Sequence, residues 1–385
     1  MKKDILFIVT LGIILAICIP LFNPGKGGVD LLAYWSAAHL FAHGGNPYDQ
    51  AAMSTLESQT SPERFSDLGT LSNAWNPPWL ILIMIPIGIL PYYLAIPVWI
   101  FCNILLIGMS LLITWKLCMG NQKSRGILLV YLAGFLFVET LSYLAIGQIT
   151  SVVLLGIVLS LWFFNHDMDA LAGIALLLTT IKPHITYFFI ILVFIWVIQN
   201  RRWKVIIAFL TAALISMLIF WIVIPGWLNN YILLINNLPY SQLYTSTLGS
   251  FISEKFNISI FKYSAVLLIF LVKPLLHLVK KEGWLTATNL ALLISVPLSP
   301  YGFNFDHIVI LPAFVQLIAW ASSAELSRKV MVFLAVSIIA VDLIIGKLTS
   351  INGLEYYWFF WIPLALFVIF LITWKTRDAT RKFAY

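Results

Sequence analysis

Residues 28–49 read GVDLLAYWSAAHLFAHGGNPYD, and the rest of the chain is organised around them. Asp30 lies at the start of a predicted helix, because Gly27 and Gly28 interrupt the preceding apolar span and an acidic residue in the first turn suits the helix dipole. Apolar side chains then recur at helical spacing at Leu31, Leu32, Trp35, Ala38 and Phe41. The stretch therefore predicts an amphipathic helix in the membrane interface, which the turn at 44–47 ends.

Asp30 is the first candidate for a chemical role. Its carboxylate would be held just above the bilayer, beside Tyr34 and Trp35, whose aromatic faces could stack on a sugar ring. A carboxylate in that position could accept a proton as a general base. The alternative is that Asp30 only caps its helix, and the local pattern does not distinguish the two roles.

The composition places the chain in a membrane. Hydrophobic residues make up 61% of the 385 positions and charged residues only 10%, and the mean hydropathy is +0.96. These values are typical of a polytopic membrane protein and exclude a soluble domain. The net charge of +7 comes from lysines and arginines in short loops between helices, so it indicates orientation rather than nucleic-acid binding.

Basic clusters predict which loops face the cytoplasm. They are Lys2-Lys3, Lys116–Arg125, Arg201–Lys204, Lys280-Lys281, Arg328-Lys329 and Lys375–Lys382. The spans consistent with them run approximately 5–22, 94–115, 127–145, 149–164, 170–182, 184–199, 205–224, 258–278, 284–299, 307–321, 328–346 and 356–374. We expect one all-α membrane domain over residues 1–385, with about twelve transmembrane helices and both termini in the cytoplasm, although several spans are short for a full crossing.

Residues 77–91 do not fit this count. The segment is apolar but rich in proline, and a full crossing here would move every later basic loop to the other side of the membrane. We predict a re-entrant or interfacial hairpin that leads into the helix 94–115, because irregular backbone is tolerated where protein shelters it. A full span is the alternative.

On this topology four polar stretches meet at the outer face. They are the loop 23–76, which holds Asp30 and Asp49, then Gly147-Gln148, Lys182-Pro183-His184, and residues 299–307. A second long outer loop, 226–257, could cover them. The inner side has no comparable polar set, so the sequence predicts a functional site at the outer face.

Lys182 and two histidines are the next candidates. A lysine near membrane depth either extends its ammonium to the interface or binds an anion such as phosphate. His184 and His307 each adjoin a charged residue at a helix boundary, where a structural role is the usual alternative. Glu139 and Asp342 lie inside predicted spans, and either could be a buried functional acid.

Several classes of chemistry are absent from the sequence. It contains no P-loop, no dinucleotide-binding fingerprint and no serine-hydrolase elbow. Cys18, Cys102 and Cys118 have no metal spacing and predict no disulfide. His39 and His43 are four residues apart, but without a third ligand or an HExxH motif they do not predict a metal site.

Short motifs occur along most of the chain in a particular order. They are Asp30 with Tyr34–Ala38, Gly45–Asp49, Asn76-Pro77-Pro78, Ile85-Pro86, Leu90-Pro91, Gly147-Gln148, Lys182-Pro183, Ser299-Pro300 and Asp306-His307. This order resembles that of glycosyltransferase family 87. The family belongs to the C-type, multi-membrane-spanning glycosyltransferases and includes α-1,2-mannosyltransferases that use polyprenyl-phosphate mannose.

The resemblance implies roles for particular residues. Asp30 matches the catalytic base of the superfamily, and Lys182 and His307 match positions that face the donor phosphate. The further expected substrate contacts are His184, Gln148, Tyr34, Trp35 and Asp49. Thr150 departs from the family pattern, which often has asparagine there, and this departure leaves the sugar and the acceptor open.

We expect an inverting hexosyltransferase at the outer face of a bacterial inner membrane. Nucleotide sugars are cytoplasmic, so an outward-facing site needs a polyprenyl-phosphate sugar, with mannose the first candidate, and a glycolipid or glycan acceptor. We expect membrane lipid around the chain, no metal, no other cofactor and no nucleic-acid partner. The alternatives are a transporter or flippase of a lipid-linked substrate, which would show internal repeats and ionisable residues at the bilayer midplane, and a catalytically silent scaffold.

Overall fold

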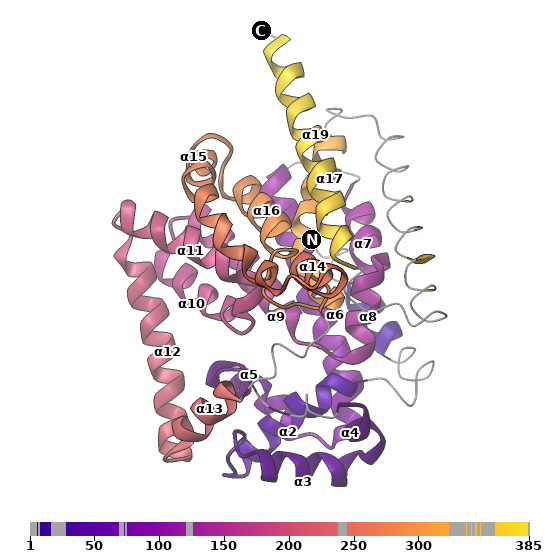
Figure 1. Cartoon of the computed structure of the whole chain (residues 1–385), viewed down its shortest axis with the longest axis vertical. Helices are drawn as coiled ribbons and strands as arrows, with labels where there is room; N and C mark the ends of the chain where they lie inside the picture. The colour runs from indigo at the N-terminus through magenta and orange to yellow at the C-terminus, as the bar shows by residue number, and fades with distance from the viewer. Residues whose placement is uncertain are drawn as a thin grey trace.

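The computed structural model describes most of the chain. The described ranges are 28–68, 75–120, 126–237, 245–322 and 359–383, with Leu6, residues 8–16, Asn73 and isolated positions at 336, 340, 343, 344 and 347. Every element within them is a helix (Figure 1), as the composition predicts. Lys123, Asp342 and most of the expected span 328–346 lie outside the described residues.

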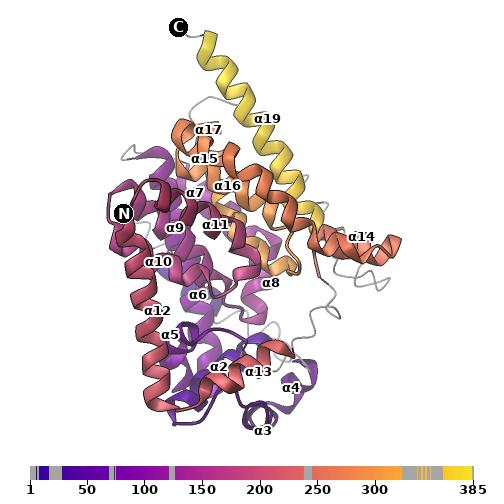
Figure 2. The same ribbon diagram turned by 60° about the vertical axis from the view of Figure 1, so that its left-hand side comes forward.

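Many of the helices are joined by three residues or fewer. Their bounds are α2 Val29–Ala42, α3 Gln50–Thr60, α4 Pro62–Leu68, α5 Pro78–Gly88, α6 Tyr92–Met119, α7 Ile127–Leu136, α8 Val138–Ile146, α9 Thr150–Asn165, α10 Asp169–Thr179, α11 Pro183–Gln199, α12 Trp203–Val223, α13 Trp227–Asn236, α14 Leu248–Phe256, η3 Ser259–Leu271, α15 Val272–Glu282, α16 Trp284–Ser295, η4 Asn304–Ile310, α17 Leu311–Ser322 and α19 Trp361–Phe383. In both views α2, α3 and α4 lie together at one end of the molecule with α13 beside them, and α19 projects from the other end (Figures 1 and 2).

Four helical stretches of the described part are long and apolar enough to cross a membrane, judged by length and composition. They are Tyr92–Met119, Trp203–Val223, Ser259–Glu282 and Asn304–Ala321. The helices α7 and α8 give a fifth if they form one span, but they are bent by 59°. The continuous helix expected over 127–145 is therefore broken at Phe137, between the two. The total of about twelve crossings stays a prediction.

The helix α2 is buried on several sides, which corrects the expected amphipathic helix. Its buried side chains include Ser36 and Ala37 as well as the apolar positions that the pattern picked out. The helix α5 crosses it so closely that a Cβ on Gly88 would lie 2.7 Å from the backbone of Ala38. An interfacial helix would keep one face in the headgroup region, whereas α2 is packed inside protein. It is α3 that has one buried face, formed by Met53 and Glu57.

The segment 77–91 forms a short helix and a turn. The helix α5 has 11 residues, and at 1.5 Å per residue it spans about half of a hydrocarbon core of about 30 Å. The chain turns at residues 89–91 and enters α6 at Tyr92. This agrees with a hairpin leading into the next helix, although its first arm is helical rather than irregular.

Candidate active site

Asp30 lies in the first turn of α2, where that helix meets the connection between α8 and α9. The amide of Gly28 donates to the carbonyl of Ala145 at 2.8 Å, and the Tyr92 hydroxyl donates to the carbonyl of Gly28 at 2.8 Å. Gly28 is the N-cap residue, and no side chain caps the helix. The Asp30 carboxylate instead accepts a hydrogen bond at Oδ2 from Nε2 of Gln148, at 2.5 Å. Asp30 therefore makes no helix-capping hydrogen bond, so the structure does not support the alternative in which Asp30 only caps α2.

The turn that carries Gln148 is held by buried hydrogen bonds. Gly147 has a φ of +78°, and a Cβ there would lie 2.9 Å from the Cβ of Leu31, so both the backbone conformation and the approach of α2 require glycine. The Gln148 carbonyl accepts from Nε1 of Trp99 and from Nδ2 of Asn103, each at 3.1 Å. The Gln148 side chain thus projects toward Asp30 from a rigid support.

Lys182 reaches the same amide from the turn between α10 and α11. Its Nζ donates to Oε1 of Gln148 and to Oδ1 of Asp306, both at 2.7 Å, and only 7% of the residue is exposed. The ammonium is therefore paired inside the protein rather than extended to the interface. Asp306 is further held by the Thr150 hydroxyl, at 2.8 Å from Oδ1, and by the Phe303 amide, at 3.3 Å from Oδ2.

His184 ties the loop before η4 to the start of α11. Its ring stacks on Tyr301 with centroids 4.0 Å apart, and its Nε2 lies 3.9 Å from Oδ2 of Asp306. The Ser299 hydroxyl donates to the His184 carbonyl at 2.5 Å. The imidazole therefore lies beside the Lys182–Asp306 pair, in agreement with the position of His184 two residues after Lys182 in the sequence.

His307 contacts a second buried acid. Its Nδ1 lies 3.9 Å from Oε1 of Glu139, and Oε2 of Glu139 accepts from Nδ2 of Asn304 at 2.8 Å. His307 and Glu139 are both almost completely buried. The structure thus brings His307 to Glu139 rather than to Lys182, and the expected contact with the donor phosphate stays a prediction.

Of the remaining predicted residues, Tyr34 joins the site and two others have different partners. The Tyr34 hydroxyl donates to Oε1 of Gln148 at 3.0 Å. The Nε1 of Trp35 donates to the carbonyl of Leu90, in the turn between α5 and α6, at 2.9 Å. The Asp49 carboxylate accepts amides of the first turn of α3 and so caps that helix. The predicted substrate contacts of Trp35 and Asp49 stay predictions, because both side chains have other hydrogen-bond partners in the structure.

We call the joined residues the Asp30–Asp306 cluster. Its members are Asp30, Tyr34, Gln148, Thr150, Lys182, His184 and Asp306. They come from α2, from the start of α9 and the turn before it, from the start of α11 and the turn before it, and from η4. The four polar stretches singled out in the sequence therefore meet. Ser246, within the expected second loop 226–257, also donates its amide to the Gly302 carbonyl beside the cluster, at 2.7 Å.

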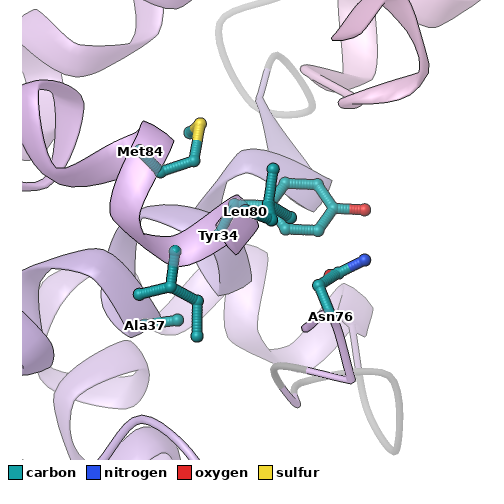
Figure 3. A pocket seen from close by; sticks show the side chains of 6 residues that line it. Tyr34, Ala37, Asn76, Leu80 and Met84 are labelled. Carbon is teal, nitrogen blue, oxygen red and sulfur yellow. The ribbon is translucent and has the colours of Figure 1, made fainter. Parts of the chain in front are cut away.

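A small pocket lies beside Tyr34. Its empty volume is about 190 Å³, and it is lined by Tyr34, Ala37, Asn76, Leu80, Ile81 and Met84. Figure 3 shows the Tyr34 hydroxyl and the Asn76 amide directed to the same side, away from Met84. The Asn76 amide donates to the carbonyl of Ile181 at 3.3 Å, next to Lys182. The pocket is closely packed and leaves no room for a substrate in this conformation. It borders the cluster through Tyr34, whose hydroxyl binds Oε1 of Gln148.

The cluster combines two carboxylates with one ammonium. Lys182 and Asp306 are buried, whereas Asp30 is half-buried. Burial raises the pKa of Asp30, and the hydrogen bond from Gln148 and the charge of Lys182 oppose that rise. A raised pKa suits a general base, which is most effective when its pKa approaches the operating pH. The cluster can therefore accept a proton at Asp30. Lys182, whose charge Asp306 balances, is its permanently cationic group and the one that could donate hydrogen bonds to an anion.

Sequence reasoning did not identify Asp306 and Thr150 as members of this site. Asp306 was part of a polar stretch and of a family motif, and Thr150 was seen as a departure from the family pattern. One signal in the sequence could have identified Asp306: a carboxylate that is buried among helices needs a cation or several hydrogen-bond donors as partners. Its cation, Lys182, is 124 residues away along the chain, and only the packing of η4 against α8 and α9 reveals the pair.

Comparison with known proteins gives one match. The family model of glycosyltransferase family 87 matches residues 75–336, which is more than half of the chain. The matched range contains Gln148, Lys182 and Asp306, and Asp30 lies before it. Searches of curated proteins and of solved structures return no match.

Proposed function

Because the chain belongs to glycosyltransferase family 87, we propose that it transfers a hexose, mannose in the first instance, from a polyprenyl-phosphate sugar to a glycolipid or glycan acceptor. We place this reaction at the outer face of a bacterial inner membrane. One observation carries the proposal: the half-buried Asp30 carboxylate is linked through a single amide to the buried ammonium of Lys182. A proton acceptor and a site for an anionic leaving group are therefore close together.

The proposed reaction is a single in-line displacement. The acceptor hydroxyl oxygen attacks the anomeric carbon, and its proton passes to Asp30. The bond between that carbon and the phosphate oxygen breaks, and its electron pair stays on the polyprenyl phosphate. The configuration at the anomeric carbon is inverted.

The leaving group explains why one carboxylate suffices. Polyprenyl phosphate departs as an anion and needs no proton, unlike the alkoxide that the second carboxyl group of a glycosidase must protonate. Lys182 stabilises the charge that develops on the phosphate, and His184 lies beside it as a second polar group. Asp306 holds the Lys182 ammonium in place before the donor binds.

A lipid-linked donor also fits the apolar exterior of the helix bundle. The helix α12 exposes apolar side chains over most of its length, which is typical of a surface in contact with lipid. A donor with a polyprenyl tail would reach the site through the bilayer, whereas a nucleotide sugar would need a soluble nucleotide-binding domain that the sequence lacks. The transporter alternative has no supporting observation.

The direct test is a transfer assay with defined donors. Purified protein in lipid nanodiscs is incubated with polyprenyl-phosphate mannose, glucose or galactose and a membrane extract, and products are identified by mass spectrometry. We expect one donor to be consumed and a glycosylated product to form, with none from Asp30→Asn. Transfer from a nucleotide sugar alone would contradict the donor class, and absence of transfer from every donor would contradict the function.

The location is tested by cysteine labelling. We expect single cysteines near Gly45 and Gly302 to react with an impermeant maleimide added to intact cells from outside, and one near Lys123 to be protected. The reason is that basic loops stay in the cytoplasm. Labelling at Lys123 from outside would reverse the proposed topology.

A further inference from the structure

Gln148 joins the two oppositely charged groups of the site. Its Nε2 donates to Asp30 at 2.5 Å, and its Oε1 accepts from Lys182 at 2.7 Å. We propose that Gln148 is a positioning residue, whose carboxamide holds the Asp30 carboxylate in one orientation and couples it to the Lys182 ammonium. The inference rests on the function proposed above, since it assigns Gln148 to the preparation of the base rather than to contact with the sugar.

The amide can bridge these groups in only one orientation. An ammonium has only donors and an ionised carboxylate has only acceptors. The carboxamide of Gln148 must therefore present its oxygen to Lys182 and its NH₂ to Asp30. The backbone amide of Ile149, which can only donate and lies 3.3 Å from the same oxygen, supports this orientation, and the Tyr34 hydroxyl donates to that oxygen at 3.0 Å. Rotating the amide by half a turn would break both charge-assisted hydrogen bonds, which are the strong kind.

The backbone beneath the amide is also held. The carbonyls of Gly147 and Gln148 accept from Nε1 of Trp99 at 3.0 and 3.1 Å, and the Tyr143 hydroxyl lies 2.7 Å from the Gln148 carbonyl. A side chain that projects from such a turn has few alternative positions. A rigidly held Gln148 can in turn keep the Asp30 carboxylate in the orientation that the reaction requires.

The consequence for Asp30 is geometric and electrostatic. With Oδ2 engaged by Gln148, Oδ1 faces the acceptor hydroxyl and takes its proton. The hydrogen bond favours the ionised carboxylate and opposes the effect of burial. Removing the amide donor therefore raises the pKa of Asp30, and replacing it with a carboxylate adds a like charge and raises the pKa further.

The test compares pH profiles of kcat/KM for the wild type, Gln148→Met and Gln148→Glu. A hydrogen bond to a charged group contributes enough to move a titration by about one to two pH units. We expect the acid limb to move upward by that amount in Gln148→Met and further in Gln148→Glu, while KM for the donor changes little. Gln316→Met removes a buried amide between α16 and α17 and is the matched control, expected to keep the wild-type limb.

Other outcomes overturn the proposal. If the acid limb of kcat/KM in Gln148→Met has the same midpoint pH as in the wild type, Gln148 does not position the base. Gln148 is then a structural residue if KM is unchanged, or a substrate contact if KM rises. If the wild type transfers no sugar, the proposed function fails, but the positioning role is still measured by modification of Asp30 with a carbodiimide across pH, read by mass spectrometry. The midpoint of that modification moves upward in Gln148→Met if Gln148 supports the ionised carboxylate, and an unmoved midpoint rejects the inference.

Discussion

Gln148 and Gln316, the two glutamines that are buried within the described part of the chain, lie in hydrogen-bond networks of different kinds. Gln316 joins α16 to α17: its Oε1 accepts from Asn289 at 2.7 Å and its Nε2 donates to the Thr286 hydroxyl at 2.8 Å. Those partners are neutral side chains inside the bundle. Gln148 has an ammonium at one end and a half-buried carboxylate at the other.

The difference in partners indicates different roles: the Gln316 network attaches one helix to another, whereas the Gln148 network holds charged groups that can take part in a reaction. Neutral hydrogen bonds between helices inside a membrane contribute on average about 0.6 kcal/mol each, because the unfolded helices also find polar partners. Removing one member of a buried ion pair costs about 3–5 kcal/mol, because a charge is left uncompensated. A chain that keeps Lys182 and Asp306 buried together maintains a costly arrangement, and such groups in membrane proteins mark functional sites.

The largest effect that would distinguish the two networks is expected at Asp30. Asp30→Asn keeps the shape of the side chain but removes proton acceptance, so we expect the transfer rate to fall about 10²–10⁴-fold. Single-turnover assays measure this loss, and donor binding should be retained. Asp49→Asn is the matched control, because asparagine is nearly as good a helix cap as aspartate. Normal transfer by a folded Asp30→Asn variant would remove Asp30 from the mechanism.

The next effect is expected when the buried ion pair is broken. Lys182→Met should lower transfer about 10²–10³-fold by removing the charge that stabilises the leaving phosphate. It should also destabilise the protein by about 3–5 kcal/mol, because Asp306 is left unpaired. Thermal unfolding in detergent measures the second effect. Adding Asp306→Asn should recover stability but not transfer, whereas recovery of both would show that Lys182 has only a structural role.

A smaller effect is expected on lowering the pH. The base must be ionised, and burial raises the pKa of Asp30, so acidification protonates it at a higher pH than the value of about 3.9 for an ordinary aspartate. Transfer by the wild type should therefore decline from neutral pH downward, with a midpoint above that value. The residual rate of Asp30→Asn should lack this limb. The same limb in both proteins would assign it to another group.

The smallest effect is expected in the neutral network. Gln316→Met loses two neutral hydrogen bonds, so we expect destabilisation on the order of 1 kcal/mol and an unchanged transfer rate per folded molecule. Quantified folded protein and the transfer assay together measure this. A large loss of rate at constant folded amount would show that the α16–α17 network contributes to the chemistry.

Much of the helical architecture could be predicted from local sequence. The spans expected at 149–164 and 184–199 agree closely with α9, Thr150–Asn165, and α11, Pro183–Gln199. Long apolar runs bounded by glycine, proline and charge determine such helices, because backbone hydrogen bonds must be satisfied within each segment in lipid. The expected helix over 127–145 is wrong at Phe137, where the backbone is extended and α7 and α8 are bent by 59°. There the Phe137 ring packs on Phe314 of α17, a contact that the local sequence does not show.

The sequence by itself determined the membrane class, the order of the family motifs and the candidacy of Asp30 and Lys182, because composition, helix signals and charge in an apolar context are local properties. Only the tertiary structure decided the partners. It paired Lys182 with Asp306, turned the Gln148 amide toward Asp30 and placed His307 beside Glu139. These choices join residues more than 100 positions apart, and a sequence shows which groups need a partner but not which partner the packing of helices brings within hydrogen-bonding distance.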